Sequence, residues 1–217
     1  GSVGNSMAKW ARFVVIALAL TACASDSDSR RFPKHFLFGT ASAGFQHDMG
    51  CPTLPREECE DPNSDWYQYI TSPITLESPI THLSKQPPST GPGQWELYES
   101  DFDLAARNLH NNALRLSLEW SRIFPDPTDS LSSYDDLKGA ANPRALDHYH
   151  AVFTSLRRRG LEPFVTLNHY TLPVCIHDGV ACHQDLSTCS ARGWLDRERV
   201  VREIAKFAAF CGREFGG

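Results

Sequence analysis

The order of apolar and polar positions along the chain predicts short strands that alternate with longer helices. Residues 36–41 form an apolar run with aromatic side chains that ends in small residues, which predicts a buried strand. Residues 113–120 alternate between apolar and polar side chains and predict a second strand with one polar face. A short apolar run at residues 164–167 predicts a third strand.

Three segments have the periodicity of amphipathic helices, and two of them have recognisable ends. The first covers residues 95–111, the second begins after Asn142 and the third begins after Asp196. Asn and Asp side chains cap helix N-termini, Pro143 suits a first helical position, and Gly160 suits a helix end. The expected apolar faces are Trp95, Tyr98, Phe102, Ala105 and Leu109; Leu146, Tyr149, Phe153 and Leu156; and Val200, Ile204, Phe207 and Cys211.

The order of strand, loop and helix predicts an α/β fold of repeated βα units. The connections from helix to strand are short, whereas the loops after the strands are long, as in a (β/α)₈ TIM barrel whose active face is built by those loops. A doubly wound sheet has the same alternation. No glycine-rich phosphate loop follows the first strand, and large polar and aromatic residues end the strands, so the barrel is the favoured prediction.

Composition and charge exclude some classes of protein. The formal net charge is −5 and no basic stripe is visible, so nucleic acid is not an expected partner. The nine histidines are scattered, and none joins a Cys/His cluster with metal-ligand spacing, so no metal site is predicted.

The N-terminal region predicts an export signal with a lipid anchor. The apolar run from Phe13 to Leu20 is too short to span a bilayer and is followed by Cys23 in a sequence that resembles a bacterial lipobox. A plain secretory signal is the alternative. We expect residues 1–23 to be a leader and lipoprotein signal peptide, residues 24–31 a flexible tether and residues 32–217 the folded part. Lipid on Cys23 would hold the exported protein on a bacterial membrane, in the periplasm or at the outer surface.

Six further cysteines suit an exported protein. Four of them lie in two loops, so a local disulfide is expected in each loop, between Cys51 and Cys59 and between Cys182 and Cys189. The sequence leaves the other pairings of the six cysteines open. The other two cysteines are Cys175 and Cys211. A free thiol is an equally good interpretation for Cys211, which lies on a predicted helix face.

Polar and aromatic side chains follow the predicted strands. Gln46 comes just after the first strand, Arg115 lies within the second, and His169 and Tyr170 end the third. Amides and imidazoles form hydrogen bonds with sugar hydroxyls, and aromatic faces pack on pyranose rings. These residues are compatible with a sugar site, although other barrel enzymes place similar side chains there.

Several ordered segments together resemble glycoside hydrolase family 1. Residues 36–46, 114–125 and 167–173 are similar to the family's motifs at its first three strands, and residues 61–66 and 91–95 resemble its archaeal-type β-glycosidase branch. The resemblance runs from about Phe32 to Phe215. It implies that residues 32–217 are the N-terminal part of a (β/α)₈ catalytic barrel, with about the first three βα units.

The resemblance also implies a retaining mechanism and neither metal nor cofactor. In the family, an acid/base glutamate lies in an Asn-Glu-Pro motif after the fourth strand, and a nucleophile glutamate lies in a Glu-Asn-Gly motif after the seventh. Neither motif occurs in this sequence. We therefore expect that the full-length protein hydrolyses β-linked glucosides or galactosides, that this chain contains no catalytic residue, and that it is inactive alone.

Four residues are carried over from the family as binding residues. Gln46 and His169 match side chains that hold hydroxyls of the non-reducing sugar, and Arg115 matches the arginine that contacts the nucleophile and would keep it ionised. Tyr170 stands where the family usually has tryptophan, which implies a smaller aromatic floor. The alternatives are a loop-capping amide for Gln46, a structural histidine for His169 and a buried ion pair for Arg115.

Other prominent side chains are interpreted as structural. The family pattern gives Glu119 no catalytic part, so this carboxylate near the strand end is expected to be structural. We expect Trp66, Trp95 and Trp120 to belong to the core and not to a sugar platform.

A second hypothesis belongs to a different class: a non-catalytic, lipid-anchored carbohydrate-binding or degenerate protein. Three βα units would leave an open sheet edge and exposed apolar surface, which disfavours an independent module. Coding DNA beyond Gly217 would separate the two hypotheses, because the enzyme requires both glutamate motifs downstream.

Overall fold

The computed structural model describes residues 31–216, and the predictions for the leader, for Cys23 and for nearly all of the tether fall outside them. Residues 31–37 belong to a different unit from the one that begins at Phe38, and in them the Phe36 amide donates to the Pro33 carbonyl at 2.9 Å. No helix within residues 31–216 combines the length and the hydrophobicity that crossing a bilayer requires.

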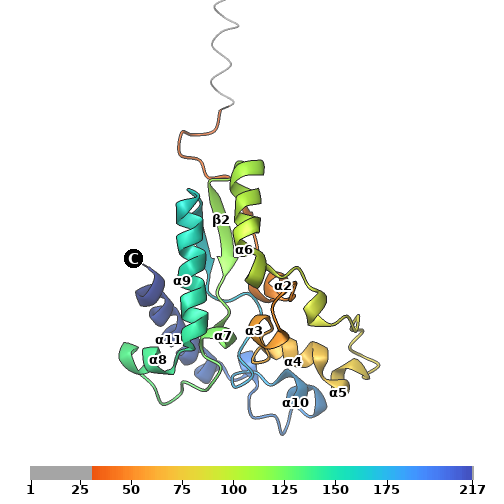
Figure 1. Cartoon of the computed structure of the whole chain (residues 1–217). Coiled ribbons are helices and arrows are strands. Elements are labelled where there is room, and N and C mark those ends of the chain that lie inside the picture. The colour runs from red at the N-terminus through yellow and green to blue at the C-terminus, as the bar shows by residue number, and fades with distance from the viewer. Residues whose placement is uncertain (1–30, 217) are drawn as a thin grey trace, which may run out of the picture. The chain divides into compact units, whose positions relative to one another are not determined.

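The second unit is built on a parallel sheet, as the alternation of elements predicts (Figure 1). The sheet has the order β1 (Gly39–Ala41), β2 (Ala113–Ser117) and β3 (Glu162–Thr166). Its register places Ala41 opposite Arg115, and Ser117 opposite Thr166. These three strands are not closed into a barrel, so the structure confirms the α/β class and the parallel strands but describes only part of the expected architecture.

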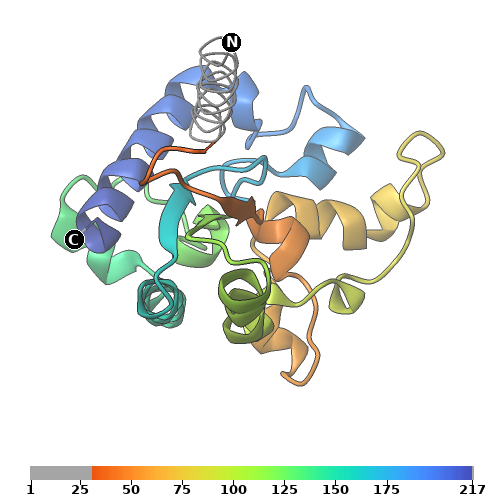
Figure 2. The ribbon, with the colours of Figure 1, turned by 90° about the horizontal axis from the view of Figure 1, so that it is seen from above.

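Helices follow each strand, and the long segment after β1 carries several short ones (Figure 2). The α-helices are α2 (Gly44–Asp48), α3 (Arg56–Cys59), α4 (Asp65–Thr71), α5 (Pro73–Leu76), α6 (Gln94–Asp103), α7 (Trp120–Ile123), α8 (Tyr134–Ala140), α9 (Pro143–Arg158), α10 (Gly179–Gln184) and α11 (Arg197–Phe215). The shorter turns are η1 (Pro88–Thr90), the π-helical η2 (Leu104–Asn108) and η3 (Gly193–Leu195).

The two long helices begin where their capping residues predict. The Asn142 side chain accepts a hydrogen bond from the Arg144 amide at the start of α9, and Asp196 does the same for the Arg199 amide in α11. Gly160 follows α9 with a φ of +70°, the left-handed backbone that glycine adopts without steric cost.

The core lies between β2 and the helices α6, α9 and α11. Of the residues predicted to form apolar faces, most are buried: Phe102, Ala105, Leu146, Tyr149, Phe153, Leu156, Val200, Phe207 and Cys211. Trp95, Tyr98 and Ile204 are half-buried against this cluster. Leu109 is an exception, because it follows η2 and its side chain is exposed.

Several predicted boundaries were wrong. The predicted buried strand at 36–41 forms a ladder only from Gly39, and β1 is exposed throughout. Among the strands of residues 31–216 it pairs with β2 alone. The second strand ends at Ser117, because the Glu119 amide donates to the Tyr149 hydroxyl at 2.9 Å and the chain turns into α7. The third begins at Glu162 and ends before Leu167.

Both local disulfides form, between Cys51 and Cys59 and between Cys182 and Cys189. Of the cysteines in residues 31–216, Cys175 and Cys211 remain as thiols. Burial raises the pKa of the Cys211 thiol, which lies in the core and is therefore not reactive.

Candidate functional site

Arg115 and His169 meet at the carboxyl ends of β2 and β3. One Arg115 guanidinium nitrogen, Nη2, lies 3.0 Å from Nδ1 of His169. Nε donates to the Thr166 hydroxyl at 2.7 Å, and Nη1 donates to the Ser42 carbonyl at 3.4 Å. The guanidinium therefore joins the ends of all three strands, since Ser42 follows β1 directly.

The contact with Arg115 fixes the chemical state of His169. A guanidinium is always a donor, so Nδ1 must accept, which places the imidazole proton on Nε2. Burial, the charge of Arg115 and the charge of His47 together lower the pKa of His169 below its ordinary value. A neutral imidazole with a donating Nε2–H can form a hydrogen bond with a hydroxyl oxygen.

Tyr170 extends this site with aromatic surface. Its ring centroid lies 4.7 Å from that of His169, and its ring is stacked on Trp66 with a centroid distance of 5.7 Å and an interplanar angle of 11°. Tyr170 has a φ of +72°, an uncommon backbone conformation for a residue with a side chain, and it is 65% exposed. The chain thus presents this ring at the surface beside His169.

The three tryptophans expected in the core differ in their environments. Trp120 is buried and stacked on Phe207, as predicted. Trp66 is only half-buried, and its stacking with Tyr170 makes it part of the site, so its assignment to the core was wrong. Trp95 is also half-buried and packs under the Arg122 guanidinium at 3.8 Å.

Gln46 lies on α2, the short helix after β1, and its side chain is exposed. No hydrogen bond links it to Arg115 or His169 among the interactions within residues 31–216. Its chain neighbours do reach the site, because Phe45 packs edge-on against Trp66 at 5.9 Å and His47 is close enough to affect the pKa of His169. The structure therefore brings three predicted residues together and places the fourth on an adjoining helix.

Glu119 lies beneath the site and is buried. Its Oε2 accepts from the Thr171 hydroxyl at 2.6 Å, while Oε1 is without a hydrogen-bond partner in residues 31–216. Burial, together with the nearby charge of Asp48, raises the pKa of Glu119 to about 8. A neutral carboxyl that connects β2 to the segment after Tyr170 supports the structural interpretation of this residue.

A buried ionic group beside Glu119 had no signal in the sequence pattern. The Arg122 guanidinium lies 4.0 Å from the Asp48 carboxylate and donates to the Cys59 carbonyl at 2.7 Å. Burial raises the pKa of Asp48 to about 7, although Arg122 opposes this shift. These residues join α2, α7 and the first disulfide loop. Across residues 31–216, no three His, Cys, Asp or Glu side chains gather in a way that could hold a metal ion.

A parallel βα sheet with polar and aromatic groups at its carboxyl edge is the arrangement found in part of a (β/α)₈ barrel. The family model "Glycosyl hydrolase family 1" matches residues 28–217. The chain belongs to this family, which confirms the resemblance found in the sequence.

Named relatives agree with the archaeal-type branch. The chain is 36% identical over 208 residues to a β-galactosidase of Pyrococcus woesei, covering 85% of this chain and 39% of the relative. It is 34% identical over 201 residues to a β-galactosidase of Saccharolobus solfataricus, with the same coverages of 85% and 39%. The structure is similar to the β-glycosidase from Thermosphaera aggregans, with a TM-score of 0.77, 32% identity, and coverage of 86% of this chain and 41% of that one. The chain thus spans about two fifths of the length of these relatives.

Proposed function

We propose that this chain is the sugar-binding, N-terminal part of a retaining β-glycosidase that acts on β-linked glucosides or galactosides. The contact between Arg115 and His169 is the observation that carries the proposal, because it places two matched family residues together at neighbouring strand ends. Membership of the family and similarity to proteins named β-galactosidase support the reaction class.

Each site residue has a proposed part in binding. His169 donates from Nε2 to a hydroxyl of the non-reducing sugar, and Tyr170 offers its exposed ring to a pyranose face. Gln46 contributes an amide from α2. Arg115 faces the nucleophile carboxylate of the complete enzyme and keeps it ionised, which its permanent charge allows.

We further propose that the chain does not hydrolyse glycosides alone. The 217 residues contain neither the Asn-Glu-Pro nor the Glu-Asn-Gly motif that would carry the two glutamates of a retaining enzyme. An assay of the purified chain with an aryl β-glucoside is therefore expected to give no turnover. Turnover with retention of configuration would contradict this proposal.

Anchoring through lipid on Cys23 is a separate proposal that rests on the lipobox-like sequence. Expression in a bacterium fed radiolabelled palmitate is expected to label the chain and to place it in the membrane fraction. A Cys23→Ser variant should lose the label, whereas a Cys175→Ser variant should keep it. Labelling that survives Cys23→Ser would contradict the proposal.

The binding role is tested by titrating the ¹⁵N-labelled chain with glucose and galactose. Amide shifts are expected at Gln46, His169 and Tyr170. A His169→Ala variant should weaken binding about threefold to tenfold, the value of one lost hydrogen bond. His110→Ala, at an exposed position outside the site, is the matched control and should bind as the original chain does. Unchanged binding in His169→Ala would remove the proposed sugar site.

A further inference from the structure

A cavity of about 370 Å³ lies between the loop closed by the first disulfide and the start of α9. That loop contains α3, and Figure 1 labels both helices. The volume is within the range of small-molecule sites. We call this space the α3–α9 cavity. Its lining includes none of the four proposed sugar-site residues, so it is a separate place on the molecule.

Three packed side chains form one wall of the α3–α9 cavity. The Trp95 ring packs against the Arg122 guanidinium at 3.8 Å and against the His148 ring, with centroids 3.5 Å apart. All three residues line the cavity. Burial lowers the pKa of His148 to about 3, so its ring is neutral and Arg122 is the charged member of this wall.

The Arg122 guanidinium has hydrogen-bond donors that the fold leaves without partners. A guanidinium carries five N–H donors. Its Nη2 donates to the Cys59 carbonyl, its Nε has no hydrogen-bond partner within residues 31–216, and the Asp48 carboxylate is 4.0 Å away, too far for a hydrogen bond. Arg122 is only 6% exposed, and buried polar groups are normally paired. An acceptor bound in the cavity would supply a missing partner.

The α3 side of the cavity is acidic. Glu57 and Glu58 line it, both are exposed, and neither forms an ion pair within residues 31–216. The first disulfide closes the loop that carries them, and Glu96 of α6 accepts hydrogen bonds from the Thr53 and Leu54 amides of the same loop, at 3.1 and 3.2 Å. The two carboxylates are therefore presented by a loop that is held at several points.

The α9 side of the cavity is basic. Arg144 lines the cavity in the first turn of α9, is exposed and forms no ion pair with another described residue. The helix has 16 residues, and the positive end of its dipole lies at this same turn. Together with Arg122, this side would attract a carboxylate, whereas the α3 side would attract an ammonium group.

Two further acidic residues of the lining are engaged by the protein itself. Glu60 accepts from the Arg56 guanidinium at 2.9 Å, and Asp61 accepts from the Ser121 hydroxyl at 2.6 Å. The charges available to a ligand are therefore the exposed carboxylates on the α3 side and the guanidiniums on the α9 side. A ligand with a single charge would meet a like charge on one side, whereas a zwitterion would pair with both.

We propose that the α3–α9 cavity binds a free α-amino acid with an apolar side chain. Its carboxylate lies towards Arg122 and Arg144, and its ammonium group lies towards the carboxylates of α3. Leu54 and Ala145, which also line the cavity, offer apolar contact to the side chain. This site does not depend on the proposed sugar site.

The experiment titrates the full ¹⁵N-labelled chain with L-leucine and with two analogues of it. Isocaproate is leucine without the amino group, and isoamylamine is leucine without the carboxylate. Leucine is expected to shift the amides of Glu58, Arg122 and Arg144. It should bind about threefold to tenfold more tightly than either analogue, because each analogue loses one ionic contact at a partly exposed site.

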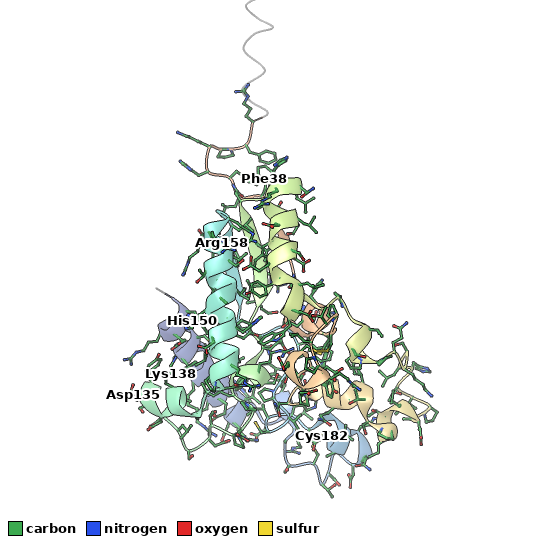
Figure 3. The ribbon with its side chains drawn as sticks, in the orientation of Figure 1. Phe38, Asp135, Lys138, His150, Arg158 and Cys182 are labelled. Carbon is green, nitrogen blue, oxygen red and sulfur yellow. A yellow bond between two sulfur atoms is a disulfide. The ribbon has the colours of Figure 1, made fainter. Side chains whose placement is uncertain are left out.

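Variants at exposed positions assign the two sides of the cavity. A Glu57→Gln/Glu58→Gln double variant should bind leucine about threefold to tenfold more weakly and isocaproate no more weakly. Arg144→Gln should weaken leucine and isocaproate but not isoamylamine. Asp135→Asn on α8 and Arg158→Gln at the opposite end of α9 are matched controls for the two charges, and Figure 3 labels both residues. They should bind leucine as the original chain does.

The outcomes separate this proposal from the sugar site. Leucine that binds no more tightly than both analogues, or that leaves the amides of Glu58 and Arg144 unshifted, would overturn the amino-acid site. Equal weakening in the cavity variants and in the two controls would also overturn it, since the effect would then come from overall charge. Failure with leucine leaves glucose shifts at His169 as they are, and absence of those shifts leaves leucine binding as it is.

Discussion

The central strand and the two edge strands of the sheet differ in burial, although apolar residues predicted strands at all three. In β2, every residue is buried except Arg115, which is half-buried. In β3, by contrast, Phe164 is 48% exposed and Val165 is 40% exposed, and β1 is exposed throughout. Apolar sequence therefore predicts a strand, whereas burial depends on the neighbours that pair with it and cover it.

The central strand also organises the site, because its polar residues reach both neighbours. Arg115 bonds to Ser42 after β1 and to Thr166 in β3. The Ser117 hydroxyl accepts from the Gly44 amide at 2.5 Å, which fixes the start of α2. Ser117 and Arg115 thus link the central strand to the segments after β1 and β3 that carry Gln46 and His169.

The largest expected effect is on the free energy of unfolding, which should fall much more after an alanine substitution in β2 than after one in β3. Leu116→Ala in β2 should lower the free energy of unfolding by about 2–5 kcal/mol, because it leaves a cavity in the core. Val165→Ala in β3 removes less buried surface and should cost about 0.5 kcal/mol or less. Urea unfolding followed by fluorescence measures both. Similar losses in the two variants would show that the edge strand is covered in solution.

The sequence predicted more of the helices than of the strands. Asn142 and Asp196 marked helix starts because a cap needs only local chemistry, and both caps form. The exposure of β1 depends on strands far away in the sequence, so a local pattern could not predict it. Family motifs located His169 and Arg115, which meet, whereas Gln46 forms no hydrogen bond with either of them within residues 31–216. The Asp48–Arg122 pair depends on the packing of α2 against α7, which periodicity does not encode.

A smaller loss of stability is expected from a substitution at Gly44, at the start of α2. A Cβ added to Gly44 would lie 1.8 Å from Oε1 of Glu119, and the buried Glu119 side chain has little room to move. Gly44→Ala should therefore lower the free energy of unfolding by about 1–3 kcal/mol. It should also disturb sugar binding, since α2 carries Gln46.

Gly212→Ala is the matched control for this substitution. Gly212 lies in α11, and an added Cβ there would meet nothing within 4 Å. Alanine should stabilise the helix by about 0.5–1 kcal/mol. If Gly44→Ala were as harmless as Gly212→Ala, the close packing of α2 on the end of β2 would be incorrect.

The smallest expected effect is a pH dependence of stability, caused by the buried carboxyls of Glu119 and Asp48 at the end of the central strand. Folding raises the pKa of Glu119 to about 8 and that of Asp48 to about 7. At a pH above the ordinary pKa of these carboxyls, the folded state therefore holds more protons than the unfolded state. The free energy of unfolding consequently falls as the pH rises towards 8. The slope is at most about 1.4 kcal/mol per pH unit for each carboxyl.

The window from pH 6.5 to 8 isolates this effect, because the buried His148, with a pKa lowered to about 3, changes stability only below the ordinary pKa of histidine. Glu119→Gln keeps the shape of the side chain and the bond from Thr171 but removes the titrating group. Its stability should fall less over this window than that of the original chain, with the remaining loss due to Asp48. The exposed Glu77→Gln variant should retain the original slope. Equal slopes in all three proteins would mean that Glu119 is ionised and solvated, and that the end of β2 is as open as the edge strands.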